Sequence, residues 1–329
     1  MLRDSYNRKI SDLRISLTDR CNFRCFYCLP NGEPPLARKE TILTFEEIER
    51  VARIFVSLGI EKIRLTGGEP LIRRDVPGLV EKLSALKPAL SDIALTTNGF
   101  DLPRHAAALK SSGLDRVTIS LDSLDPKNFA DITGVDALGK VLDAIASARE
   151  LRFDPIKINA VVIRGRNDHE VVDLARFARD NNISMRFIEF MPLDSGHEWD
   201  RSLVVSGREI REKIGAAFPL ALIEATRGSE TSWKYRFADG SPGEIGIIAP
   251  VTEMFCGQCS RIRLTADGQI RTCLFSTDEH DLRSVVRSGS SDGEVEEFIR
   301  SVVMTKEPRH YINDNSFQPA SRTMSFIGG

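Results

Sequence analysis

Residues 13–190 alternate short β-branched runs with longer helical patterns, and this alternation constrains the fold more than any other feature of the chain. It is typical of successive βα units that build a parallel sheet. Six strands are predicted, at residues 13–18, 62–66, 92–97, 116–121, 156–163 and 184–190. A complete barrel of this kind has about eight units. The sequence therefore predicts an α/β fold, an incomplete (β/α)6 TIM-like barrel whose strands end on one face, where barrel enzymes place their active sites.

The helices between these strands are predicted from apolar residues that recur at helical spacing. The clearest one begins at Thr44, which forms a capping box with Glu47 ahead of an apolar face that includes Ile48, Val51 and Phe55. Further helices are predicted at residues 76–86, 103–111, 137–151 and 169–179.

The βα rhythm breaks after residue 191 into shorter segments that glycine and proline separate. Asp267-Gly268, between strand patterns at 261–265 and 269–273, is a strong hairpin signal, and a helix is predicted near 295–303. We therefore predict two domains. Residues 1–190 form the barrel core, and residues 191–329 form a smaller C-terminal α+β region.

The composition argues against several classes of protein. The formal charge of −2 gives no overall basic field that would attract nucleic acid or anionic lipid. No apolar run approaches the roughly 20 residues that span a bilayer, and the polar start Met1-Leu2-Arg3-Asp4 is unlike a secretory signal. We therefore expect a cytoplasmic protein. In that reducing compartment, six cysteines in two tight groups indicate metal or redox chemistry rather than disulfides.

The first cysteine group follows the first predicted strand. Cys21, Cys25 and Cys28 form a C-x3-C-x2-C pattern in a loop. A 4Fe-4S cluster takes one protein ligand per iron, so three thiolates leave one iron open to bind an exogenous chelate. The alternative is a Cys3His zinc site, but this loop contains no histidine.

A glycine-rich turn follows the second predicted strand, at residues 66–70 with the sequence Thr-Gly-Gly-Glu-Pro. Gly67 and Gly68 would let a ligand approach the backbone closely. Alone, such a turn is more often structural than functional. Its pairing with the cysteine loop favours the functional interpretation.

Together the cysteine loop and the glycine-rich turn resemble the radical S-adenosylmethionine (SAM) superfamily, whose members carry a cluster loop after strand one and a GGE-type motif after strand two. The resemblance implies a cluster that binds SAM at its open iron. It also implies that Tyr27, Gly68, Ser120 and Met191 line the cosubstrate, and each lies at a predicted strand end or in a loop.

The second cysteine group lies in the C-terminal region. Cys256, Cys259 and Cys273 form a C-x2-C-x13-C pattern, again with three thiols. A Cys3His zinc site completed by His280 is one interpretation. The other is a second 4Fe-4S cluster, whose open iron could bind a nitrogen or oxygen of the substrate.

Basic residues on predicted strands indicate an anionic substrate. Arg261 and Arg263 would point to the same side of their strand, and two guanidiniums on one face suit a polyphosphate. Arg14, Arg64 and Lys157 alternate with apolar neighbours and would point into the barrel, where an unpaired charge is costly. Thr96 adds a hydroxyl. A solvated strand face is the alternative for the arginine pair.

The motifs together resemble the molybdenum cofactor biosynthesis protein A family over essentially the whole chain, including Cys-Gly-x-Cys-Ser-Arg-x-Arg-Leu-Thr and a terminal Gly-Gly. The family implies a lyase, a GTP 3',8-cyclase. A 5'-deoxyadenosyl radical from SAM abstracts the ribose 3' hydrogen of GTP, and the product is (8S)-3',8-cyclo-7,8-dihydroguanosine 5'-triphosphate. A partner synthase then makes cyclic pyranopterin monophosphate. An electron donor is required, and a homodimer is compatible with the resemblance.

The resemblance assigns roles residue by residue. Cys21, Cys25 and Cys28 would hold the radical-generating cluster, and Cys256, Cys259 and Cys273 the cluster on the substrate side. The GTP contacts would be Arg14, Arg64, Thr96, Lys157, Arg261 and Arg263. Arg261 and Arg263, with the first three cysteines, are the candidate catalytic residues. Gly328-Gly329 would reach the active site. Two alternatives remain: another radical enzyme with an auxiliary cluster, and a zinc-stabilised binding protein.

Overall fold

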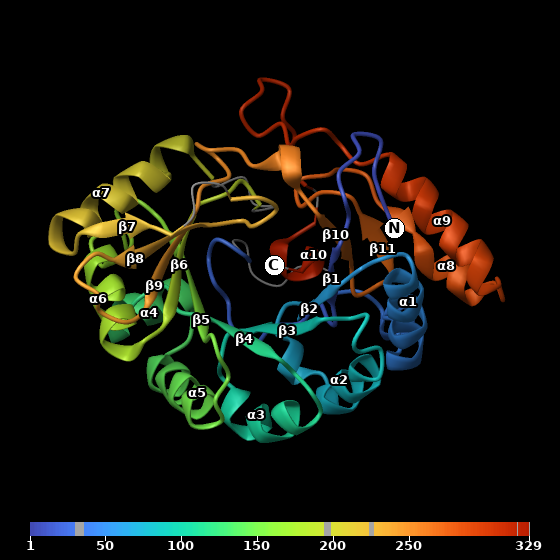
Figure 1. Cartoon of the computed structure of the whole chain (residues 1–329), viewed down its shortest axis with the longest axis horizontal. Helices are drawn as coiled ribbons and strands as arrows, with labels where there is room; N and C mark the ends of the chain where they lie inside the picture. The colour runs from blue at the N-terminus through green and yellow to red at the C-terminus, as the bar shows by residue number, and fades with distance from the viewer. Residues whose placement is uncertain (30–35, 194–198, 224–226, 321, 329) are drawn as a thin grey trace.

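The computed structural model describes residues 1–29, 36–193, 199–223, 227–320 and 322–328. This part of the chain forms one sheet of twelve strands in the order β12-β11-β10-β1-β2-β3-β4-β5-β6-β9-β8-β7. The sheet curves into an open arch with helices on its outer side (Figure 1). The terminal Gly329 lies outside the described residues.

The six strands that the sequence predicts are all present, each within two residues of its predicted bounds. They are parallel and adjacent in chain order. Their bounds are β1 Asp12–Ser16, β2 Lys62–Thr66, β3 Asp92–Thr97, β4 Arg116–Ser120, β5 Lys157–Val162 and β6 Ser184–Glu189. The predicted α/β fold, with the six parallel strands of an incomplete barrel, is therefore confirmed.

Two further parallel strands come from the C-terminal region, and the sequence does not predict this pairing. β9 (Glu244–Ile248) pairs with β6, and β10 (Arg261–Leu264) pairs with β1. These strands cover the two edges that a six-stranded sheet would leave with unpaired backbone groups. The C-terminal region thus completes the sheet rather than forming a separate one.

The remaining strands extend this sheet in antiparallel fashion. β11 (Gln269–Arg271) pairs with β10 across the Asp267-Gly268 turn, so the predicted hairpin is confirmed. β12 (His280–Asp281) follows at one edge, and β8 (Trp233–Phe237) and β7 (Leu220–Leu222) end the sheet at the other.

Helices cover the outer face of the sheet (Figure 1). The capping box of Thr44 and Glu47 starts the first one, as predicted. The short α4 is not predicted, although Asp125 caps it and Pro126 opens it. The helices are α1 Phe45–Ser57, α2 Val76–Ser84, α3 Leu102–Ser111, α4 Pro126–Thr133, α5 Leu138–Glu150, α6 Val171–Asn181, α7 Gly207–Ala217, α8 Leu282–Arg287, α9 Asp292–Met304 and α10 Met324–Ile327; short 3-10 turns are η1 Lys39–Thr41, η2 Pro70–Ile72, η3 Arg201–Leu203 and η4 Cys256–Gln258.

The two faces of the sheet differ in chemistry because side chains alternate along each strand. Leu13, Ile15 and Leu65 are fully buried in the apolar layer between sheet and helices. Arg14 and Arg64 stand between such residues and face the interior of the arch, where they line cavities. No helix in the described part of the chain is long and apolar enough to cross a membrane.

Candidate active site

Three adjoining cavities run through the interior of the arch. The first, of about 200 Å³, is lined by Cys21, Cys25 and Cys28. The second, of about 170 Å³, is lined by Cys256, Cys259 and Cys273, and the third, of about 60 Å³, is mostly polar. Thr96, Asn159, Ile188, Met191 and Met324 line both the first and the second cavity, whereas Arg14, Arg64, Arg186 and Arg261 line both the second and the third. The structure therefore brings both cysteine groups and the predicted basic residues into one continuous site.

The glycine-rich turn after β2 holds the first cysteine loop in place. The backbone N–H of Gly68 donates to Thr18 O at 2.7 Å, and that of Glu69 donates to Arg20 O at 2.7 Å. A Cβ at residue 68 would lie 2.2 Å from Arg20 O. The approach that glycine permits here is made by the cysteine loop itself, which explains why the two motifs occur together.

Glu69 of the same turn ties β2 to β3. Its carboxylate accepts hydrogen bonds from Thr97 Oγ1 at 2.8 Å, from Asn98 N at 2.7 Å and from Leu71 N at 3.0 Å. Burial raises its pKa to about 7, despite these donors. Glu69 thus holds Thr97 and Asn98, which line the first cavity, in place.

A second buried carboxylate holds the aromatic ring beside the cysteines. Tyr27 Oη donates to Asp122 Oδ2 at 2.6 Å, and Val161 N donates to Asp122 Oδ1 at 2.8 Å. Burial raises the pKa of Asp122 to about 6 and the pKa of Tyr27 well above its ordinary value. Asp122 is not among the predicted site residues, although an acidic residue close after a barrel strand is a signal of an active-site position.

The four residues that the resemblance assigns to SAM all line the first cavity: Tyr27, Gly68, Ser120 and Met191. Thr96, which the resemblance assigns to GTP, lies at the border with the second cavity. These residues lie at the strand ends and in the loops where the sequence places them. The roles themselves remain predictions.

The first cavity suits an iron–sulfur group. Burial raises the pKa of the Cys21 and Cys25 thiols and that of Cys28 to about 12. A bound metal group carries positive charge, so it would stabilise the thiolate forms and lower these thiol pKa values again. Sulfur ligands without a histidine among the lining residues favour iron–sulfur chemistry.

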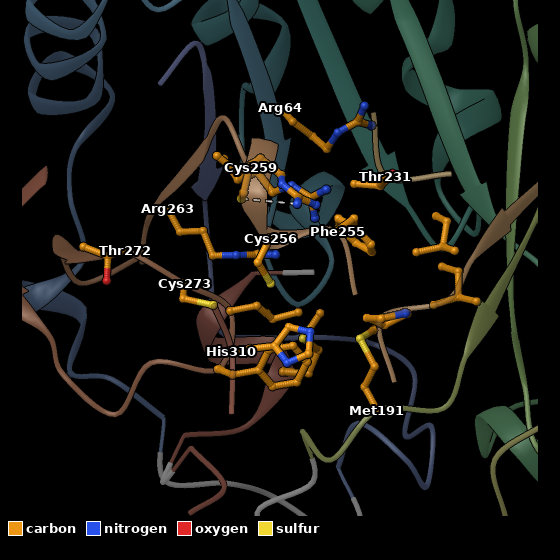
Figure 2. Close-up of a pocket in the computed structure, with 18 of the residues that line it drawn as sticks. Arg64, Met191, Thr231, Phe255, Cys256, Cys259, Arg263, Thr272, Cys273 and His310 are labelled. Atoms are coloured by element: carbon orange, nitrogen blue, oxygen red, sulfur yellow. Dashed lines mark hydrogen bonds between the residues drawn. The ribbon is translucent and has the colours of Figure 1, made fainter. Parts of the chain in front are cut away.

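The second cysteine group surrounds its own cavity (Figure 2). Burial alone would raise the pKa of the Cys259 thiol, but the charges of Arg261 and Lys306 outweigh it and lower this pKa to about 6. Arg261 Nη2 donates to Cys259 Sγ at 3.3 Å. The second cavity therefore already favours a thiolate ligand.

The structure does not place His280 beside the second cysteine group, so a zinc site completed by His280 is not supported. His280 lies on β12, where its Nε2 is 3.5 Å from Thr305 Oγ1, and it does not line the second cavity. His310 does line that cavity, yet within the described ranges no three His, Cys, Asp or Glu side chains are grouped to hold a metal ion. A zinc ion would need its ligands within about 2.3 Å. The group that the three thiols of this cavity hold therefore stays a prediction.

Arginines form a ladder across three neighbouring strands. Arg263 on β10, Arg14 on β1 and Arg64 on β2 are direct neighbours in the sheet register. Burial, together with the charges of Arg263 and Arg64, holds the pKa of Arg14 well below its ordinary value. Like charges directly opposite each other destabilise a sheet. The ladder would therefore suit a bound anion.

The third cavity continues this basic character toward the other end of the strands. It is lined by Lys157 and Arg186 with Arg14 and Arg64, and its acidic residues include Glu230. Burial, followed by the charges of Arg186 and Arg116, lowers the pKa of Lys157 to about 7. All six residues that the resemblance assigns to GTP thus line the second or third cavity.

Several polar residues of the site are absent from the sequence analysis. Arg186 shares the inward face of β6, and alternation along that strand could have identified it. Within the described part of the chain, the Nε atoms of Arg14, Arg186 and Arg261, Asn159 Oδ1 and both ring nitrogens of His310 are buried without a hydrogen-bond partner. Buried polar atoms normally have partners, so these atoms could bind the polar groups of a ligand.

The comparisons with known proteins define first the class of protein. The family model of the radical SAM superfamily matches residues 15–178, and that of molybdenum cofactor synthesis C matches residues 183–312. Streptococcus suis SuiB bound to S-adenosylmethionine has a similar structure, with a TM-score of 0.64 over 96% of this chain and 77% of that chain at 15% identity. Native anSMEcpe with bound AdoMet gives a TM-score of 0.58 over 92% and 82% at 13% identity. The solved structures share the fold, and the chain is a radical SAM protein.

The sequence relatives narrow this class. A GTP 3',8-cyclase of Streptomyces coelicolor is 45% identical over 100% of this chain and 96% of the relative. Those of Rhodopirellula baltica and Syntrophomonas wolfei are 44% and 42% identical, over 100% and 99% of this chain and 92% and 99% of the relatives. The chain belongs to the GTP 3',8-cyclase family.

Proposed function

We propose that the three cavities form one active site in which the protein acts as a GTP 3',8-cyclase of molybdenum cofactor biosynthesis. The observation that carries this function is the order of the cavities. A cavity with three thiols and the predicted SAM contacts adjoins a cavity with three further thiols, and that cavity adjoins a basic one. The parts of a nucleoside triphosphate match this order. The ribose would lie next to the SAM cavity, the base at the second cysteine group and the charged phosphate chain at the basic residues.

Cys21, Cys25 and Cys28 would hold the 4Fe-4S cluster that binds SAM, with Tyr27, Gly68, Ser120 and Met191 around the cosubstrate. When bound, this group supplies the radical that removes the ribose 3' hydrogen of GTP. Tyr27 is held by Asp122, so its ring needs little reorganisation. Thr96 and Met191 line the border of the first and second cavities, where the ribose would lie.

Cys256, Cys259 and Cys273 would hold a second 4Fe-4S cluster at the guanine end of the substrate. The low pKa of Cys259 and the soft donor set support this assignment. Arg261, Arg263, Arg14 and Arg64 would bind phosphate oxygens, with Lys157 at the far end. Guanidiniums bind such oxygens in bidentate fashion, and the surrounding burial strengthens each contact.

The remaining assignments follow from this activity. The enzyme would be a lyase that acts in the cytoplasm, receives electrons from a donor protein and passes its product to a cyclic pyranopterin monophosphate synthase. A homodimer remains compatible with the chain. Residues 1–190 would supply most of the SAM site, and residues 191–329 would supply Met191, the second cluster and the Gly-Gly tail, within the single sheet that the two regions share.

Anaerobic reconstitution tests the proposed function directly. The protein is loaded with iron and sulfide, and iron per chain is counted; two clusters give about eight irons. SAM, dithionite and GTP are then added, and 5'-deoxyadenosine and the cyclised nucleotide are measured by mass spectrometry. Iron with no GTP dependence would retain the radical SAM class and reject this substrate. Zinc without iron would reject both the radical SAM chemistry and GTP as the substrate.

GTP binding is expected to take up a proton at Lys157. Phosphate oxygens favour the charged ammonium, so the pKa of Lys157 rises from about 7 when GTP binds. GTP affinity should therefore weaken as the pH rises above about 7, by up to about tenfold per pH unit for one proton. Calorimetry at several pH values, in buffers of different ionisation enthalpy, measures both the affinity and the proton uptake.

Two variants separate Lys157 from the titration of GTP itself. Lys157→Arg keeps a charge at all these pH values, so it should bind GTP with little pH dependence. Lys157→Met should bind weakly and also lose the proton uptake. An unchanged pH slope in both variants would exclude Lys157 from the phosphate site.

A further inference from the structure

Residues 322–328, here called the tail, run into the interior of the arch. Figure 1 shows α10 near the centre of the arch, next to the C marker. Ser325, Phe326 and Ile327 of the tail are buried. Met324 lines the first and the second cavity, and Ser325 lines the first. The tail therefore forms part of the wall between the two cysteine groups.

The tail touches one functional residue of each cavity. The backbone N–H of Ser325 faces the Cys28 thiol and counteracts the rise that burial causes in the pKa of that thiol. The carbonyl of Gly328 accepts a hydrogen bond from Arg263 Nη1. A shift of the tail along its own axis would break both contacts.

Local structure cannot hold the tail in this position. α10 has four residues, and a helix of that length is unstable in isolation. The side chain of Thr323, its N-cap residue, does not hydrogen-bond to the helix backbone. The position of the tail must come from contacts with the rest of the protein.

Arg322 makes the ion pairs among these contacts. Its Nη1 lies 3.1 and 3.0 Å from the two carboxylate oxygens of Asp267, and its Nη2 lies 2.7 Å from Glu279 Oε2. The guanidinium also stacks over the Phe326 ring at 4.2 Å. Asp267 is buried in the turn between β10 and β11, and Glu279 pairs with the buried Arg271 on β11 at 2.7 Å. Arg322 thus joins the tail to the hairpin that carries Arg263.

We propose that Arg322 is a positioning residue that fixes the tail between the two cysteine cavities by its ion pairs with Asp267 and Glu279. The planar guanidinium can bind two carboxylates and stack on an aromatic ring at once, which lysine cannot do. The consequence for catalysis rests on the proposed function: the same hairpin would orient the phosphate-binding Arg263 and the tail that contacts Cys28.

The test measures amide hydrogen exchange in the metal-free full-length protein, so it depends on neither clusters nor turnover. The N–H groups of Phe326 and Ile327 bond to Thr323 O at 3.0 and 3.1 Å, and that of Gly328 bonds to Met324 O at 3.0 Å. Arg322→Gln should increase exchange of the peptide that covers these amides by at least about tenfold. Arg322→Lys should restore part of the protection.

A matched control and a second variant test whether the increased exchange comes from the ion pairs of Arg322. Arg309 pairs with Asp314 at 3.1 and 3.0 Å in the same C-terminal segment, and Arg309→Gln should leave tail exchange unchanged. Asp267→Asn should loosen the tail as Arg322→Gln does. In the loaded enzyme, movement of the Ser325 N–H away from Cys28 should lower the reduction potential of the first cluster.

Two results would overturn the proposal. Unchanged tail exchange in Arg322→Gln would mean that burial of Phe326 and Ile327 suffices to hold the tail. An equal increase in Arg309→Gln would mean general loosening of the C-terminal segment. Neither result would affect the proposed GTP cyclase activity.

Discussion

The Cys256→Ser variant is expected to cleave SAM but to lose GTP conversion by at least about 100-fold. The two cysteine groups line separate cavities, so a change in the second leaves Cys21, Cys25 and Cys28 intact. A serine hydroxyl is a poor ligand for iron, and the variant should retain about four irons per chain instead of about eight. The measurements are iron content, 5'-deoxyadenosine formed from SAM under reducing conditions, and cyclised nucleotide.

The backbone around Cys256 should survive this substitution. Arg8 Nη1 donates to Cys256 O at 2.9 Å and to Pro308 O at 2.9 Å, and Arg8 is itself paired with the buried Asp4. These bonds do not involve the thiol. Cys25→Ser is the matched control, because it should abolish both SAM cleavage and GTP conversion. Normal GTP turnover in Cys256→Ser would remove the second cysteine group from the substrate site.

Local patterns in the sequence predict the barrel core closely because its elements depend on local physics. Alternation of apolar side chains determines the parallel strands, and the Thr44 capping box determines where α1 begins. The Asp267-Gly268 turn predicts its hairpin for the same reason. Each of these features is encoded within about ten residues.

The pairing of β9 with β6 and of β10 with β1 is not encoded locally. These partners lie far apart in sequence, and nothing in either strand specifies its neighbour. Local patterns also cannot identify Asp122, whose partner is Tyr27. They cannot identify Arg322 either, whose partners are Asp267 and Glu279. The arginine ladder is an intermediate case. Alternation predicts the inward direction of each side chain, but only the register of three strands makes Arg263, Arg14 and Arg64 neighbours.

The Gly328→Ala variant is expected to lower kcat/KM for GTP by about tenfold to 100-fold, or about 1.4 to 2.8 kcal/mol. A Cβ at this position would lie 2.7 Å from Thr66 Oγ1 and 2.9 Å from Ser16 Cβ, so the tail must move. That movement draws the Gly328 carbonyl away from Arg263, which it now contacts. Steady-state kinetics with varied GTP, together with SAM cleavage in the absence of GTP, measures the effect.

The Gly289→Ala variant is the matched control, because it distinguishes the loss of the Arg263 contact from the effect of backbone strain. Its φ of +84° nearly equals the +83° of Gly328, yet a Cβ on Gly289 would meet nothing within 4 Å. Both substitutions should therefore cost about 1 kcal/mol of stability through the left-handed backbone. Only Gly328→Ala should also change turnover, because only there does the added methyl group displace a segment that touches Arg263. Equal kinetic losses in both variants, or none in either, would show that the position of the tail does not govern the reaction.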